Sequence, residues 1–326
     1  MKSLLQALSA TLVMATALAV PVVHAQSYPT KPIRLVVPYG AGGGSDIVAR
    51  IIGDEMGKTL GQPLMVDNKP GAGSMVGTEI VVRSAADGYT LLLTDLPVAI
   101  VPHVLKEAVK YNPAKDFGPV GMVAGSRMSF YVNAEVPANT IQEFVSAARA
   151  RPGAVRIGSG GNGTLTHLLA EVFAQAGNFS MTHVPYNGTG PAMPDLLAGR
   201  VDGMFNSYLA VQPYLPGGKL RPLGVASPAR APELPSVPTF AEAGLPAVSV
   251  DYWFAIVGPA NLPKAVADKL RVALGKALAS PDVIEKFQRL AVSPAADVSE
   301  QALRTVIERD FVRWGEVVRE RKITVN

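Results

Sequence analysis

A glycine-rich loop near the start of the chain has residue types suited to binding. Four glycines lie within Gly40–Gly44, directly after the apolar run Ile33–Val37, which is typical of a buried strand. Ser45 or Asp46 can then cap the first turn of a helix. Glycine lets the backbone approach a ligand closely, and free N–H groups at a helix start favour an anion. The stretch fits a cradle for a carboxylate or phosphate and a tight turn without a ligand about equally well.

A second glycine loop occurs in the middle of the chain. Gly158–Gly163 has the spacing G-x-G-x-x-G between the short strand Val155–Ile157 and a helix that Thr164 begins. That spacing is found in dinucleotide sites, but the next strand, Thr182–Tyr186, ends without the acidic residue that would hold a ribose. Ligands bind at the carboxyl ends of parallel strands. Two such loops therefore favour an anion cleft over a nucleotide site.

Side chains for catalysis or for a metal are scarce. After residue 25 the histidines are His103, His167 and His183, and they form neither an H-E-x-x-H motif nor a cluster with acidic residues. No G-x-S-x-G motif marks a nucleophile, and no base next to an activated serine is evident. We therefore expect no enzyme activity, no metal and no cofactor. His167 can contact a ligand or fix the second loop, and the structural role is favoured.

Arg127 is the charged side chain best placed to meet a ligand. It follows Gly125-Ser126, where the chain is expected to cross between two domains, and its guanidinium can pair bidentately with a carboxylate. A solvated hinge charge is the equal alternative. Tyr252 and Trp253 lie at the expected return crossing, where they can wall a pocket or pack against the hinge.

Composition restricts the class of protein. The 326 residues include no cysteine and carry a formal charge of +4 without a run of Lys or Arg, which excludes thiol chemistry and disfavours nucleic acid. Lys2, the apolar run Leu4–Val20 and the small-residue site Val23–Ala25 predict a signal peptide over residues 1–25, cleaved after Ala25. An N-terminal membrane anchor is the disfavoured alternative, because polar residues interrupt the run.

The remaining residues predict two α/β units. Strand and helix patterns alternate before and after residue 127, which indicates parallel sheets covered on both faces. About 300 residues exceed what one domain usually holds. We expect one domain from residues 26–126 plus 252–326 and another from residues 127–251, with the ligand cleft between them.

The sequence resembles a known family along essentially all of the mature chain. Val36–Arg50 resembles the P-[FY]-x-x-G-G-x-x-D signature of Bug/TctC proteins, the extracytoplasmic solute receptors of tripartite tricarboxylate transporters. The likeness continues, in order, through Val66–Gly73, Asp87–Leu92, Gly161–Thr164 with His167, His183–Tyr186, and Pro235–Thr239 with Glu242–Gly244.

The resemblance implies a two-domain periplasmic-binding-protein fold of type II-like architecture that closes on a small carboxylate. It further implies a monomer in the periplasm of a Gram-negative bacterium. The ligand would be a di- or tricarboxylate or an aromatic acid, and the partners would be the permease subunits of the transporter. A sensor subunit for signalling and, disfavoured, a secreted α/β hydrolase are the alternatives.

The family also implies which residues hold the ligand. In the family, backbone groups of both glycine loops bind one carboxylate, and the matching positions here are Tyr39, Ala41, Gly42, Gly43, Asp46, Ser159, Asn162, Gly163 and Thr164. To these candidates we add Ser45, Thr94, Asp95, Arg127, His167, Tyr186 and Asn206. Members often carry Asp in place of Asn206, where it can meet a ligand amine. Its absence disfavours an amino acid, although Asp95 can partly replace it, so that ligand class stays open.

Overall fold

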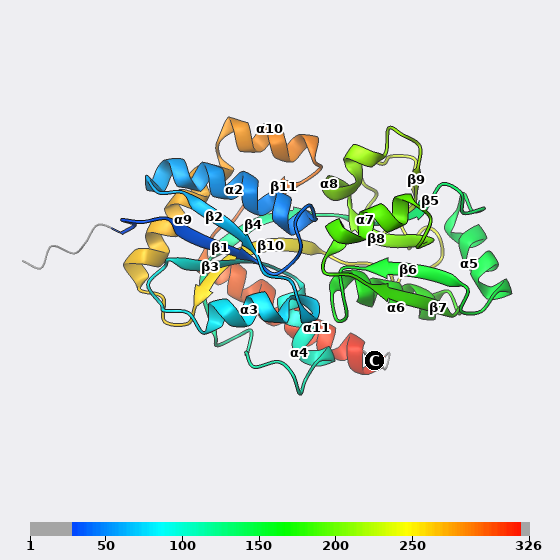
Figure 1. Cartoon of the computed structure of the whole chain (residues 1–326), viewed down its shortest axis with the longest axis horizontal. Helices are drawn as coiled ribbons and strands as arrows, with labels where there is room; N and C mark the ends of the chain where they lie inside the picture. The colour runs from blue at the N-terminus through cyan, green and yellow to red at the C-terminus, as the bar shows by residue number, and fades with distance from the viewer. Residues whose placement is uncertain (1–27, 321–326) are drawn as a thin grey trace, which may run out of the picture.

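The computed structural model describes residues 28–320. Within that range the chain forms two α/β units side by side, each built around one sheet (Figure 1). The predicted signal peptide and the predicted end of the last helix near Arg321 lie outside the described residues. The two-domain α/β architecture predicted from the sequence is confirmed.

The first sheet has the strand order β11-β4-β10-β3-β1-β2. Its strands are β1 (Ile33–Val37), β2 (Leu64–Asn68), β3 (Thr90–Asp95), β4 (Phe117–Ser126), β10 (Tyr252–Pro259) and β11 (Ser293–Pro294). β1 is parallel to β2 and β3, whereas β10 is antiparallel to β3 and β4. The parallel pairing expected from the sequence is therefore found for β1, β2 and β3, and β10 departs from it. β10 returns from the second unit, so it enters the sheet from the opposite end.

The second sheet has the order β7-β6-β8-β5-β9. Its strands are β5 (Met128–Asn133), β6 (Val155–Ser159), β7 (Met181–Pro185), β8 (Gly203–Ser207) and β9 (Leu220–Val225). β6 is parallel to β7 and β8, and β5 is antiparallel to β8 and β9. This sheet is also mixed, because β5 enters it directly from the first unit and runs antiparallel to β8 and β9.

Helices cover both faces of the first sheet. The described helices are α2 (Gly44–Leu60), α3 (Met75–Val82), α4 (Pro97–Val104), α5 (Ile141–Ala150), α6 (Leu165–Ala176), α7 (Thr189–Leu197), α8 (Tyr208–Val211), α9 (Lys264–Leu278), α10 (Pro281–Arg289) and α11 (Glu300–Glu320), with the short 3-10 helices η1 (Ala72–Ser74) and η2 (Gln212–Tyr214). Leu35 of β1 packs in one core cluster with α2, α9 and α10, while its neighbour Val36 packs with α3, α4 and α11. This alternation follows from strand geometry, which sends successive side chains to opposite faces.

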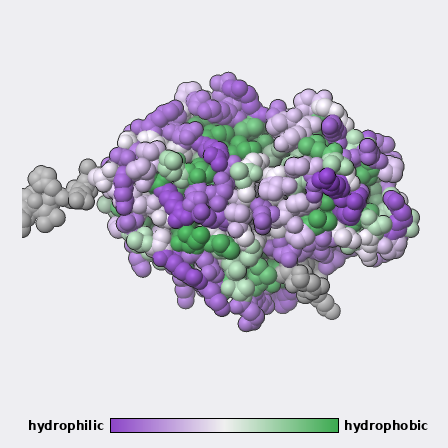
Figure 2. Space-filling model, in the orientation of Figure 1, coloured by the Kyte–Doolittle hydropathy of each residue, from purple (hydrophilic) through white to green (hydrophobic). Residues whose placement is uncertain are grey.

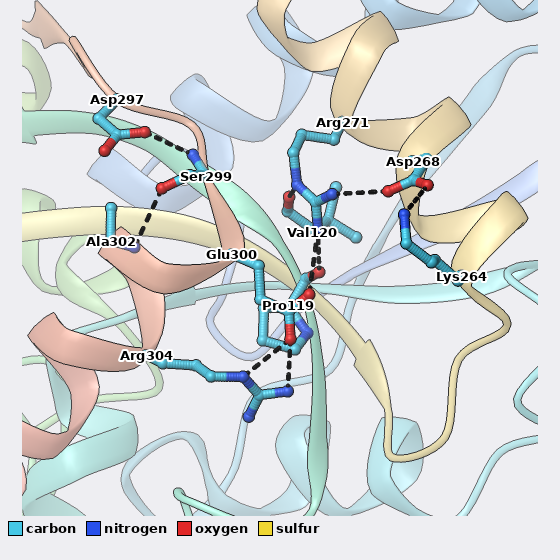
Figure 3. Close-up of polar contacts among 10 residues, drawn as sticks. All are labelled: Pro119, Val120, Lys264, Asp268, Arg271, Asp297, Ser299, Glu300, Ala302 and Arg304. Carbon is cyan, nitrogen blue, oxygen red and sulfur yellow. Dashed lines mark hydrogen bonds and ion pairs between the residues drawn. The ribbon is translucent and has the colours of Figure 1, made fainter.

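An arginine fixes α9 to the sheet. Arg271 Nε donates to Val120 O at 3.0 Å and Nη2 donates to Pro119 O at 3.2 Å, while Nη1 bonds Asp268 of its own helix at 2.9 Å (Figure 3). Ser299 accepts from Ala302 N at 3.1 Å at the start of α11. The Arg271 contacts hold α9 against the first half of β4, whereas the Ser299 bond caps the start of α11.

Two connections cross between the sheets. β4 ends at Ser126 and β5 begins at Met128, while the return runs from the end of β9 to Tyr252 at the start of β10. From these crossings we propose the domains as residues 26–126 plus 252–326 and residues 127–251. The cluster Phe130, Phe144, Phe173, Phe205 and Phe240 forms the aromatic core of the second domain.

Candidate functional site

A small cavity lies where the two units meet. Its volume is about 40 Å³, counted as space for the centre of a water-sized sphere. The lining residues come from both units: Tyr39, Gly43, Gly44, Ser45, Asp95, Pro97, Met128, Gly160, Thr164, Leu165, Thr166, Thr189, Asn206, Ser207 and Tyr252. Their side chains include one acidic group, Asp95, and no Lys or Arg.

Helix starts converge on this cavity. The lining includes the first residues of α2, α4, α6 and α7, which are Gly44, Pro97, Leu165 and Thr189. Each helix N-terminus carries partial positive charge from unpaired N–H groups and the aligned peptide dipoles. Pro97 has no N–H, so the first residue of α4 offers no donor. The four helix starts around one space still favour an anion, although no cationic side chain lines the cavity. Sequence analysis predicted two of these ends, at α2 and α6.

Asp46 holds the first glycine loop in shape. Its carboxylate accepts from Gly42 N at 3.0 Å and from Asn68 Nδ2 at 3.1 Å, and it forms an ion pair with Arg50 at 2.9 Å. Burial opposes ionisation of Asp46, but the hydrogen bonds from Arg50, Gly42 and Asn68 outweigh it and keep its pKa below the ordinary value. Gly42 has φ +81°, which favours glycine there. Asp46 therefore acts here as a loop-positioning residue.

Two stacked histidines support the second glycine loop. The rings of His167 and His183 lie 4.0 Å apart between centroids at 17°. Gly163 N donates to His167 Nδ1 at 3.2 Å, and Ser159 Oγ lies 2.6 Å from His183 Nε2. Burial, and then the nearby His167, lower the pKa of His183 to about 4. His183 is thus neutral near pH 7 and can accept from Ser159.

The pairing of Ser159 with His183 corrects one sequence-based conclusion. The sequence indicated that no base stands next to a serine, yet His183 lies within hydrogen-bond distance of Ser159. The parallel pairing of β6 and β7 causes this, because it sets Ile157 opposite His183 and leaves Ser159 nearby. Ser159 is fully buried and lines neither hollow described here. The pair therefore supports the loop and is not exposed to a substrate.

Asp95 lies at the carboxyl end of β3 with three hydroxyl partners. Tyr39 Oη donates to Oδ1 at 2.8 Å, while Ser45 Oγ and Tyr252 Oη donate to Oδ2 at 3.2 and 2.9 Å. Burial raises the pKa of Asp95 to about 6, and the hydrogen bonds from Tyr39, Tyr252 and Ser45 partly offset that effect. Among residues 28–320, no ion pair is formed by Asp95, so its charge depends on these hydroxyls.

The predicted site residues fall into three groups, according to whether they line the cavity, a second hollow or neither. Those lining the cavity are Tyr39, Gly43, Ser45, Asp95, Thr164 and Asn206. Those lining a second, wider hollow of about 540 Å³ are Tyr39, Asn162 and Tyr186. Those lining neither are Ala41, Gly42, Asp46, Thr94, Arg127, Ser159, Gly163 and His167. Direct ligand contact by any of them stays a prediction.

Arg127 and Trp253 point to partners other than the cavity. Arg127 Nη1 lies 3.9 Å from Glu233 Oε2. Trp253 Nε1 donates to the buried Asp310 of α11 at 2.7 Å. Of the two aromatic residues predicted at the return crossing, Tyr252 lines the cavity and Trp253 packs in a buried hydrophobic cluster.

Sequence reasoning missed a third glycine-containing turn. Asn187–Gly190 follows β7, and Asn187 O accepts from Gly40 N at 2.8 Å. Gly190 sits so close to the first loop that a Cβ on it would come within 2.8 Å of Gly43 N. The signal was the N-G-T-G stretch directly after a strand. This turn brings Thr189 into the cavity wall and joins the two units.

A family model matches most of the chain. Residues 48–323 match the model described as "Tripartite tricarboxylate transporter family receptor". The chain belongs to this family. Its relatives are solute-binding receptors, and the receptor class predicted from the sequence is confirmed.

Individual relatives of this receptor cover nearly the whole chain. BugT of Bordetella pertussis is 34% identical over 94% of this chain and 94% of its own length. The solved periplasmic binding protein BugD aligns with a TM-score of 0.88 at 32% identity, covering 91% of this chain and 99% of that one. MatC from Rhodopseudomonas palustris, solved with bound malate, aligns with a TM-score of 0.86 at 31% identity, covering 89% and 100%.

The described residues form neither a metal-binding cluster nor a membrane-spanning helix. Among residues 28–320, no group of three or more His, Cys, Asp or Glu side chains can hold a metal ion. In the same range, none of the helices combines the length and the apolar character needed to span a membrane.

Proposed function

We propose that this receptor captures a small organic carboxylate in the cavity between its domains and delivers it to the permease subunits of a tripartite tricarboxylate transporter. The main observation in support is that four helix N-termini converge on a cavity that no cationic side chain lines. A carboxylate there can accept hydrogen bonds from backbone N–H groups and gain from the helix dipoles. The bound malate of MatC supports the same ligand class.

The first turns of α2 and α6 supply the donors in this proposal. Ile47 N bonds Gly43 O and Leu168 N bonds Thr164 O, so the preceding N–H groups of each helix have no intrahelical partner. These groups include those of Gly44 and Ser45 on α2, and those of Leu165 and Thr166 on α6. One carboxylate between them would join the two domains, which favours the closed form.

Export and the quaternary state are part of the proposal. The sequence of residues 1–25 supports a cleavable signal peptide and a periplasmic location in a Gram-negative bacterium. Figure 2 shows hydrophobic residues in separate patches among hydrophilic ones on the visible face. The exposed large hydrophobic residues belong to different elements: Met65, Val76, Tyr214, Val272 and Val312. Such scattered positions fit a monomer.

A thermal-shift screen tests the ligand class. Mature protein is unfolded and refolded to remove bound ligand, and its melting temperature is measured with short mono- and dicarboxylates and with their primary amides. A ligand that binds only the native state raises apparent stability. We expect at least one acid to raise the melting temperature and its amide to have no effect, because a neutral amide gains little from the helix dipoles. Equal shifts for acid and amide would contradict carboxylate recognition.

A hydrolase is the second candidate, because Ser159 and His183 are hydrogen-bonded. The burial of Ser159 opposes it. A panel of short esters separates the two functions. Turnover that Ser159→Ala abolishes would favour a hydrolase, and absence of turnover would favour a receptor. Uptake of the ligand that depends on a neighbouring permease gene separates transport from a signalling role.

A further inference from the structure

We propose that α11 braces the return crossing between the domains and thereby favours the closed form, so that residues outside the cavity change the affinity for every ligand by one common factor. α11 lies in the proposed first domain and runs along the first sheet toward the second unit (Figure 1). The inference rests on the proposed capture of a carboxylate between the domains, and it adds a control of closure.

A buried hydrogen bond fixes α11 to the start of β10. Trp253 Nε1 donates to Asp310 Oδ2 at 2.7 Å, and both residues are buried. Arg309 donates to both carboxylate oxygens of Asp310, at 2.8 and 3.1 Å, so the buried charge of Asp310 is paired. Removing one partner from such a group is costly. α11 is therefore a firm support for β10 at the point where this strand begins.

The same helix reaches the chain before the crossing. Arg313 Nη2 donates to Ser249 O at 3.4 Å, and Ser249 belongs to the residues that we assign to the second domain. The hydrogen bonds to Asp310 raise the pKa of Arg309, and the charges of Asp310 and then of Asp251 add to that effect. Asp251 therefore attracts the same helix. A rotation of the second domain would stretch or break these contacts, so they favour the closed form.

Adjacent residues of β10 connect this brace to the cavity. Successive side chains of a strand point to opposite faces. Trp253 bonds α11, whereas Tyr252 lines the cavity and donates to Asp95 at 2.9 Å. A second link runs through α4, because His103 Nε2 lies 2.7 Å from Phe311 O of α11. A displacement of α11 would therefore also displace parts of the cavity wall.

The apparent affinity depends on how much of the free protein is closed. If the closed form is the one that binds, the apparent Kd equals the intrinsic Kd divided by the closed fraction. A substitution of Arg313 changes that fraction and leaves the intrinsic Kd alone, because Arg313 lines neither the cavity nor the wider hollow. Every ligand should then lose affinity by the same factor. A direct ligand contact would instead affect ligands of different structure unequally.

Arg313→Ala tests the brace, with Arg304→Ala as the matched control. Each substitution removes one positive charge from α11, but Arg304 pairs with Glu300 of its own helix at 2.8 Å. Isothermal titration calorimetry measures two acids of different charge from the thermal-shift screen, starting with succinate and butyrate. We expect Arg313→Ala to weaken binding of both acids by the same factor of about three, as for the loss of one exposed hydrogen bond. Arg304→Ala should leave both affinities unchanged.

Trp253→Phe tests the other end of the brace. It keeps an aromatic ring in place and removes the Nε1 donor, while Asp310 keeps its pair with Arg309. We again expect a common loss of affinity for both acids. Circular dichroism checks that each variant is folded, and the exposed Arg313 carries the test if Trp253→Phe does not fold.

The outcomes separate this proposal from the proposed function. Unchanged affinities in Arg313→Ala, or losses that differ between the two acids, would overturn the brace and leave the carboxylate receptor intact. The same loss in Arg304→Ala would assign the effect to the net charge of the helix and would also overturn the brace. If no acid of the screen binds the original chain, the receptor proposal and the brace fail together.

Discussion

Tyr252 Oη donates to Asp95 Oδ2 across 2.9 Å and so connects the strand that returns from the second domain to the bottom of the cavity. Tyr39 and Ser45 reach the same carboxylate from the first glycine loop and from α2. A movement of β10 at the crossing would therefore displace residues of the cavity wall directly. One hydrogen-bonded cluster therefore joins the crossing at Tyr252 to the lining of the cavity.

Gly190→Ala should weaken ligand binding without unfolding the protein. A Cβ at this position would lie 2.8 Å from Gly43 N of the other domain, which is too close for real carbon atoms. The φ of Gly190 is not in the left-handed region, so alanine is compatible with the open form. Closure would be impeded, and we expect a loss of affinity of at least tenfold, measured by calorimetry with the ligand from the screen.

Gly217→Ala is the matched control for this substitution. Its Cβ would meet Tyr214 O at an ordinary 3.9 Å, and its φ is also outside the left-handed region. We expect unchanged affinity and an unchanged melting temperature. Unaltered affinity in Gly190→Ala would mean that ligand binds without the contact between these loops.

Asp95 should make the protein less stable as pH rises. Its pKa is raised from 3.8 to about 6 in the folded state, so folding favours the protonated form. The free-energy penalty for the buried charge of Asp95 is absent below pH 3.8, the pKa of the unfolded state. It develops as the pH rises from there to about 6. Two pKa units correspond to about 3 kcal/mol. The free energy of unfolding of ligand-free protein, measured with urea, should therefore decrease from pH 4 to pH 7.5. This decrease should be smaller in Asp95→Asn than in the original chain.

The comparison of two pH values isolates Asp95 from the other carboxylates. Asp46, for example, has a lowered pKa and gives the opposite slope, but it is present in both proteins. Tyr39 and Tyr252 remain neutral throughout this range, because burial, and then the charge of Asp95, raise the pKa of each far above 10. Identical pH slopes in the two proteins would rule out this role for Asp95.

Arg127→Ala distinguishes a ligand contact from a surface charge. The sequence leaves two roles for Arg127, a pair with a ligand carboxylate or a solvated hinge charge, and loss of a desolvated pair would cost on the order of 2–5 kcal/mol. The guanidinium lies 3.9 Å from Glu233 and outside the cavity lining, so we expect affinities for mono- and dicarboxylates to stay within about threefold. Calorimetry with a matched pair of acids decides this. A loss of affinity confined to the dicarboxylate would instead support a direct contact between Arg127 and the ligand.

Ligand binding should make the molecule more compact. The crossings near Arg127 and Tyr252 are the places where the domains can rotate, and contacts such as Gly40 N to Asn187 O hold them together. Small-angle X-ray scattering of stripped protein should give a larger radius of gyration than the same sample with saturating ligand. The same radius in both samples would oppose hinge closure.

The first glycine loop and the start of α2 could be predicted from sequence because local rules determine them. An apolar run and clustered glycines specify the strand and the turn before α2 within Ile33–Leu60. The expected cap by Ser45 or Asp46 was wrong, because Gly43 occupies the N-cap position of α2 and no side chain caps it. The same rules located the second loop and the helix that begins at Leu165. The antiparallel direction of β10 could not be predicted from these local rules, since strand direction depends on the path of the whole chain.

The contacts of the cavity could not be predicted from sequence for a similar reason. Tyr252 and Asp95 are 157 residues apart, and only the antiparallel pairing of β10 with β3 brings them together. His183 meets Ser159 through the register of β6 and β7. Arg127 was chosen for its place in the chain, and a place in the chain does not specify the direction of its side chain.

Backbone amide chemical shifts report directly on carboxylate binding by the helix N-termini. In transverse-relaxation-optimised NMR spectra of deuterated, ¹⁵N-labelled protein, a carboxylate from the screen is titrated against its primary amide. We expect the largest shifts at the N–H groups of Gly44, Ser45, Leu165 and Thr166, with the acid and not with the amide. The largest shifts in the wider hollow around Asn162 and Tyr186, with the four helix-start amides unmoved, would contradict binding by helix N-termini in the inner cavity.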